Sequence, residues 1–89
     1  MAAAEERQLE EMLRASLRSQ DLNPVRIAAF SELCDRMLLE DPSNVSFVAR
    51  MADVANEGQR EANRRGADDI PWAALERVLR ESVGRYTER

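Results

Sequence analysis

Histidine is missing from the 89-residue chain, and cysteine occurs once, as Cys34. Without histidine the chain can form neither a Ser-His-Asp nor a Cys-His catalytic pair, and it has no histidine to ligate a metal. One cysteine excludes an intrachain disulfide and a cysteine-rich zinc site. Paired carboxylates alone can catalyse some reactions, but no pair here has suitable placement. We therefore predict a non-enzymatic protein with no catalytic, metal-binding or cofactor-binding residues.

Lysine and long apolar runs are missing as well. All 13 basic residues are arginine, a coding bias of GC-rich genomes that indicates a bacterial or phage source. No apolar stretch approaches the roughly 20 residues of a membrane span, and no basic region followed by an apolar run opens the chain. We predict a cytoplasmic protein with no membrane partner. The net charge of −4 favours solubility and disfavours nucleic acid as a partner.

Glycine and proline are scarce, so their positions divide the chain clearly. Pro24, Pro42 and Pro71 each lie near a candidate helix start, and Gly66 lies where a helix C-cap is expected. The resulting helices are predicted at about 3–18, 24–40, 43–65 and 70–85. No segment alternates apolar and polar residues as a strand would. The predicted fold class is all-α: a single small domain over residues 1–89, with about four helices in compact, antiparallel, bundle-like packing.

Apolar side chains recur at helical spacing in each segment. Gly58 continues the stripe of the third helix, and we interpret it as a point of close approach to another helix. Four i,i+4 ion pairs are expected on the outer faces. The predicted core stripes are Leu9, Met12, Leu13 and Leu17; Ile27, Phe30, Leu33, Cys34, Met37 and Leu38; Phe47, Val48, Met51, Val54, Ala55, Gly58 and Ala62; and Trp72, Leu75, Val78, Leu79, Val83 and Tyr86. The expected pairs are Glu10–Arg14, Glu32–Arg36, Glu76–Arg80 and Glu81–Arg85.

Leu39 interrupts the polar side of the second helix, where Glu32, Asp35 and Glu40 flank it. It is either covered by the turn around Pro42 or exposed. An exposed leucine within an acidic rim resembles a small interface, with an apolar centre and charges that steer the partner's approach. We interpret this face as the preferred docking site for a partner protein.

Two further features have both structural and functional interpretations. Trp72, near a helix start, either packs in the core or anchors a partner in an interface pocket. Arg60, Arg64 and Arg65 either complement the negative end of the third helix or form an arginine patch for carboxylates or phosphates. The patch lacks interleaved aromatic residues, so it favours nucleic acid only weakly.

These observations predict a small protein-binding module, a regulator or inhibitor of the antitoxin, phage anti-defence or chaperone type that docks on a partner protein. The first alternative is a structural or assembly subunit that acts through its own homo-oligomer. The second is a nucleic-acid binder that uses Arg60, Arg64 and Arg65. The mass in solution separates the first two classes, and salt-dependent binding to DNA or RNA identifies the third.

Overall fold

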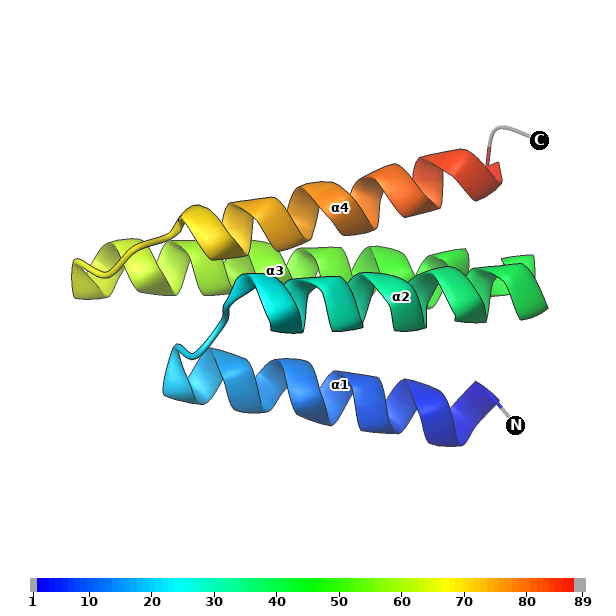
Figure 1. Ribbon diagram of the computed structural model, residues 1–89, viewed down its shortest axis with the longest axis horizontal. Helices are drawn as coiled ribbons and strands as arrows, with labels where there is room; N and C mark the ends of the chain where they lie inside the picture. Colours follow the sequence, from blue (N-terminus) through cyan, green and yellow to red (C-terminus); the bar gives the residue numbers. More distant parts are fainter. Residues whose placement is uncertain (1, 88–89) are drawn as a thin grey trace.

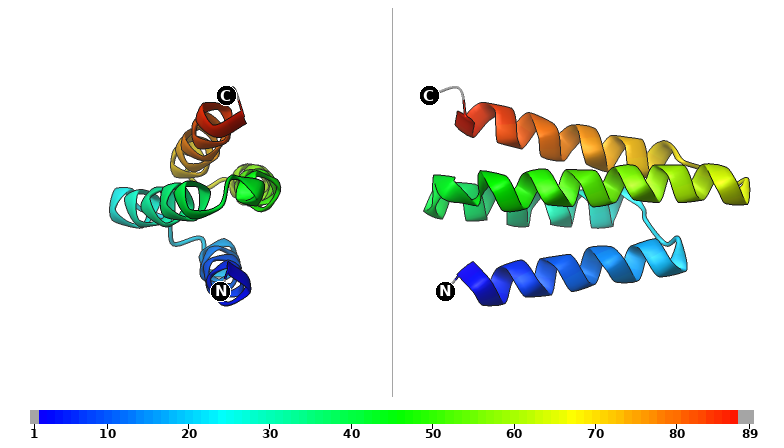
Figure 2. Two further views of the ribbon diagram at one scale, coloured as in Figure 1. Left: turned by 90° about the vertical axis from the view of Figure 1, so that its right-hand side faces the viewer. Right: turned by 180° about the vertical axis from the view of Figure 1, so that it is seen from behind.

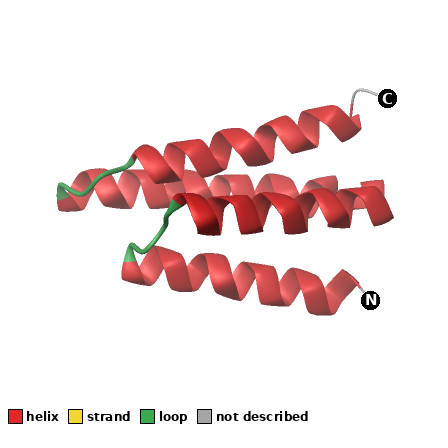
Figure 3. Ribbon diagram, viewed as in Figure 1, coloured by secondary structure: helices red, strands yellow, loops and turns green. Residues whose placement is uncertain are grey.

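The computed structural model of the protein describes residues 2–87 and contains four helices in chain order (Figures 1 and 3). They are α1 (Ala2–Ser19), α2 (Pro24–Glu40), α3 (Val45–Arg65) and α4 (Ile70–Thr87), with a 3-10 turn at Pro42–Asn44 ahead of α3. Consecutive helices run in opposite directions, and residues 2–87 contain no strand. The predicted all-α fold with four antiparallel helices is therefore confirmed.

The helix boundaries follow local capping chemistry. The Asn23 side-chain oxygen accepts a hydrogen bond from the backbone N–H of Arg26 at 3.0 Å and caps α2. Gly66 ends α3 in the left-handed conformation, with φ of 70°. The Asp68 carboxylate accepts from the backbone N–H of Ile70 at 3.0 Å where α4 begins. The C-cap predicted at Gly66 is thus present.

The two outer helices lie on opposite sides of a central pair. In the end-on view of Figure 2, α4 lies over α2 and α3 on one side, and α1 lies below them on the other. The α3–α4 pairing is the most extensive, whereas α1 packs mainly on α3 and only sparsely on α2. The C-terminal end of α3 and the loop before α4 project beyond the α1–α2 hairpin (Figure 1). The α1–α2 pairing is therefore much less extensive than the α2–α4 and α3–α4 pairings.

The core closes most tightly where α3 meets α4. A Cβ atom added to Gly58 would lie 2.2 Å from Cε3 of Trp72, so the indole ring lies directly on the α3 backbone. This contact confirms the interpretation of Gly58 as a point of close approach. The buried apolar residues are Leu9, Leu13, Leu22, Phe30, Cys34, Met37, Leu38, Phe47, Val48, Met51, Ala52, Val54, Ala55, Ala62, Trp72, Leu75 and Leu79.

One residue of the expected core is corrected, and two serine side chains lie inside the core. Met12 was expected inside the core stripe of the first helix, but its side chain is 38% exposed because α2 does not close over it. Ser16 and Ser82 are fully buried instead. The Ser16 hydroxyl accepts a hydrogen bond from the Arg26 guanidinium at 3.2 Å, which satisfies it without a bond to its own helix.

Three of the four expected surface ion pairs are present, and one is not. Glu10–Arg14, Glu32–Arg36 and Glu76–Arg80 form at 3.1, 3.7 and 2.9 Å. Arg85 was expected to pair with Glu81 but reaches Asp35 of α2 at 3.0 Å. Arg85 of α4 thus pairs with the carboxylate of Asp35 on α2 in place of the expected carboxylate of Glu81 on its own helix.

Candidate functional site

Leu39 is exposed on the outer side of α2, in the last turn of the helix. Its side chain is 72% exposed, so the turn around Pro42 does not cover it. Glu40 and Asp41 follow directly and are also exposed, and Glu32 is exposed two turns earlier. We call the group of Leu39, Glu40 and Asp41 the acidic end of α2.

The charges at the acidic end of α2 oppose the usual pattern at a helix C-terminus. The last turns of α1, α3 and α4 contain arginine, which the negative end of a helix dipole attracts. The last turn of α2 contains no basic residue, and Glu40 and Asp41 lie there instead. Hydrogen bonds from the side chain and backbone of Ser43 hold the pKa of Asp41 below its usual range, so this carboxylate stays charged. A cation is therefore missing where the helix favours one.

Asp35, which was predicted to belong to the same rim, has a structural partner on α4. Its carboxylate accepts a hydrogen bond from the buried Ser82 hydroxyl at 2.7 Å and pairs with Arg85 at 3.0 Å. The side chain is half-buried between α2 and α4. Asp35 thus ties two helices together, and the exposed acidic residues around Leu39 are Glu32, Glu40 and Asp41.

Trp72 lies in the core and not at the surface. Its side chain is 1% exposed and its ring rests on Gly58. Of the two interpretations of Trp72, this burial agrees with core packing and not with a partner anchor, because an anchor must be accessible before binding. From the sequence alone, a tryptophan near a helix start can lie either in the core or at the surface. Trp72 lies in the core because Gly58 of α3 leaves room for its ring.

The three arginines near the end of α3 are partly neutralised by their own helix. Arg64 and Arg65 both pair with Glu61, the latter at 2.9 Å. The hydrogen bonds from Arg64 and Arg65 lower the pKa of Glu61, so the Glu61 carboxylate stays negatively charged beside the two arginines. Arg60 is exposed and pairs with no carboxylate among residues 2–87. The predicted arginine patch thus has one arginine without an ion pair among residues 2–87 rather than three.

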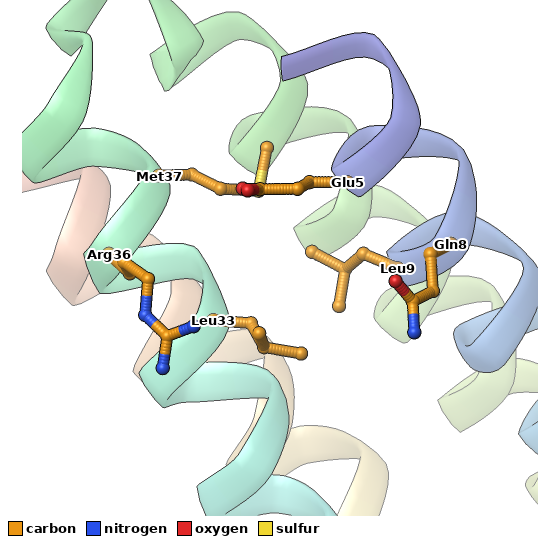
Figure 4. A pocket seen from close by; sticks show the side chains of 6 residues that line it. All are labelled: Glu5, Gln8, Leu9, Leu33, Arg36 and Met37. Carbon is orange, nitrogen blue, oxygen red and sulfur yellow. The ribbon is translucent and has the colours of Figure 1, made fainter. Parts of the chain in front are cut away.

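A second surface feature, which the sequence interpretation missed, is a groove between α1 and α2. One hollow of about 180 Å³ lies near the start of α1, where the Leu9 and Leu33 side chains extend into the gap from the two helices (Figure 4). A second hollow of about 400 Å³ lies toward the α1–α2 turn. We call the two together the α1–α2 groove. The lining residues are Glu5, Gln8, Leu9, Leu33, Arg36 and Met37 in the first hollow, and Met12, Ala15, Arg26, Ala29 and Phe30 in the second.

The signal for this groove was present in the sequence but ambiguous. Ala15 and Ala29 occupy positions on the facing sides of α1 and α2, and both are exposed. Their small side chains cannot bridge the gap that Met12 leaves open. Periodicity assigns apolar residues to one face of a helix, but it does not tell how closely two such faces approach one another.

The groups with chemical reactivity are few. Burial, and then the neighbouring Asp35 charge, raise the pKa of the Cys34 thiol from 9.0 to about 12. Within residues 2–87 no three histidine, cysteine or acidic residues gather as metal ligands would. None of the helices described is both long and apolar enough to cross a membrane.

Comparison with known protein families, with curated proteins and with solved structures reveals no significant match to this chain. The functional argument accordingly rests on the two surface features, the acidic end of α2 and the α1–α2 groove.

Proposed function

We propose that this protein is a small non-enzymatic binding module, a regulator or inhibitor that docks on a partner protein through the acidic end of α2. The observation that supports this most directly is the exposed Leu39 beside Glu40 and Asp41, at a helix end that lacks a cation. The negative charge of Glu40, the last residue of α2, is unfavourable at that end for the isolated chain. A partner with a basic surface around an apolar pocket would supply both the missing cation and a cover for Leu39.

The two components of this surface have different roles in binding. Full burial of a leucine side chain contributes about 1.5–3 kcal/mol, and 72% of the Leu39 side chain is available for it. The carboxylates of Glu32, Glu40 and Asp41 contribute mainly to the rate of association and to the choice of a basic partner. The surface therefore combines an apolar contact with charges that select the partner.

The experiment is an affinity capture from the native host, followed by titration of the captured partner against variants. Leu39→Ala should weaken binding by more than about 1 kcal/mol, the level that marks a contributing contact. Glu40→Arg should slow association, with a smaller loss at high salt. Thermal melting of each variant should show an intact fold.

Ile70→Ala is the matched control. Ile70 is 70% exposed, next to acidic residues, at the opposite end of the molecule. Its truncation should leave partner binding unchanged. If Leu39→Ala and Ile70→Ala bind the partner as tightly as the unaltered chain does, the acidic end of α2 is not the docking surface.

A further inference from the structure

The outer face of α2 carries exposed apolar side chains near both of its ends. Val25, in the first turn, is 79% exposed, and Leu39 is similarly exposed in the last turn. At about 100° per residue, the two positions lie within about 40° of one another around the helix. At the helical rise of 1.5 Å per residue, they lie about 21 Å apart along it. The apolar contact at the acidic end of α2 therefore has a counterpart about four turns earlier on the same face.

Ala28 and Glu32 lie between these two residues on the same face, and both are exposed. The intervals along this face are therefore three, four and seven residues, which are the spacings by which one helix packs along another. Glu32 pairs with Arg36 at 3.7 Å, and because both side chains are exposed, this pair contributes little to stability. The Glu32 carboxylate can therefore exchange Arg36 for the cation of a partner. We call Val25, Ala28, Glu32 and Leu39 the outer stripe of α2.

The dipole of α2 is not compensated by the helix on which it packs most. That helix is α4, and the two run in the same direction (Figure 1). A parallel neighbour places the negative end of its own dipole beside the negative end of α2. Within α2 itself, the first turn has no acidic residue and the last turn has no basic one. An antiparallel helix on the outer stripe of α2 would bring its positive N-terminal end to Glu40 and Asp41, and its negative C-terminal end to the first turn of α2.

We propose that the partner presents an amphipathic α-helix of at least about four turns, which lies antiparallel to α2 along the outer stripe of α2. This inference rests on the proposed docking at the acidic end of α2 and extends that docking along the whole helix. Apolar side chains of the partner helix cover Val25 and Leu39, and a basic side chain between them pairs with Glu32. The small side chain of Ala28 lets the two helices approach closely. The α1–α2 groove has charges of both signs at one end, so it does not complement such a helix.

The probe is a peptide selected on the immobilised full chain from a displayed random library of about 18 residues, the length of about five helical turns. Val25→Ala and Leu39→Ala should each raise the dissociation constant of the synthesised peptide at least about 5-fold, because both ends of the outer stripe contact it. Ile70→Ala is the control, since Ile70 is about as exposed as Leu39 but belongs to α4. Circular dichroism should show that the peptide gains helix on binding and that the three variants stay folded.

The direction of the bound helix is tested by NMR with a nitroxide label on the peptide. A label at the peptide N-terminus should broaden the signals of Glu40 and Asp41, and a label at its C-terminus should broaden those around Val25. The reverse pattern overturns the antiparallel arrangement. Binding that depends on Leu39 but not on Val25 overturns the helix along α2 and leaves docking at the acidic end of α2 intact. Binding that depends on neither residue overturns both, and a selection that yields no helical peptide overturns the helix alone.

Discussion

Gly58 illustrates how one residue determines the distance between two helices. The indole of Trp72 occupies the space that a side chain at this position would need, with a Cβ placed 2.2 Å from Cε3. That approach requires glycine despite its cost of about 1 kcal/mol relative to alanine in a helix interior. The burial of Trp72, the largest side chain in the core, is the benefit that offsets this cost.

A pair of glycine substitutions tests this interpretation. Gly58→Ala should destabilise the protein by about 1–3 kcal/mol, because overpacking against a buried ring outweighs the gain in helix propensity. Gly84→Ala should be neutral or stabilise by up to about 1 kcal/mol, since a Cβ there would have no neighbour within 4 Å. Chemical denaturation of both variants gives the comparison. A stabilised Gly58→Ala protein would contradict the close contact.

Cys34 provides a residue-scale prediction for pH. The pKa of the thiol rises to about 12 in the folded chain, first because it is buried and second because Asp35 is near. The unfolded thiol ionises near its ordinary value of 9.0, so the folded state retains a proton that the unfolded state has lost. This contribution to stability is fully present below that ordinary value and is lost as the pH rises toward the folded pKa.

We therefore expect Cys34 to resist alkylation at mildly alkaline pH until the chain unfolds, because the thiolate is the reactive species. Denaturant should restore labelling, as mass spectrometry would show. The fall in stability at high pH should be shallower in Cys34→Ala. Rapid labelling of the folded protein would show that the thiol is accessible.

At the scale of a single helix, α2 differs from the other three because its C-terminal turn has acids and no arginine. Glu40→Arg replaces repulsion from the helix dipole with attraction and should stabilise the protein by about 0.3–1 kcal/mol. Glu57→Arg, in the middle of α3, should have a smaller effect because the dipole acts within the terminal turns. Thermal melts at low and high salt measure the difference. An unchanged or lowered melting temperature for Glu40→Arg would remove the electrostatic argument for this helix end.

The elements themselves could be predicted because their signals are local. Asn23, Gly66 and Asp68 determine helix ends through bonds to residues close in sequence. Contacts between helices could not be predicted in the same way. Arg85 has a suitable carboxylate one turn away in Glu81, yet it pairs with Asp35 because α2 and α4 pack together. Helical spacing predicts on which face of its helix a residue lies, but it does not predict which other helix packs against that face.

The candidate sites also differ in whether they depend on one helix or on the contact between two helices. Leu39 could be identified because an apolar residue on a polar face is visible in one helix alone. The α1–α2 groove depends on the distance between two helices, and Met12 was consequently expected in the core. Trp72 was ambiguous because its location depends on Gly58 in a different helix.

For the whole molecule, packing is unevenly distributed. The α3–α4 pair has the most extensive contacts and holds Trp72, whereas α1 lies on the opposite side with few contacts to α2. Leu9 and Leu13 of α1 are nevertheless fully buried. The helix is thus attached to the rest of the core by a short apolar row. Regions with few buried contacts open at lower free energy than the global unfolding of the protein.

Native-state hydrogen exchange should therefore show α1 opening as a separate unit, with lower protection than α3. Leu13→Ala should speed exchange mainly in α1, because the cost of the cavity, about 2–5 kcal/mol, falls on the contacts that hold this helix. Leu75→Ala, an equally buried leucine of α4, should speed exchange throughout, because it weakens the part on which the other helices pack. If α1 and α3 exchange at the same rate in both variants, the four helices form one cooperative unit and the sparse α1–α2 seam has no separate dynamics.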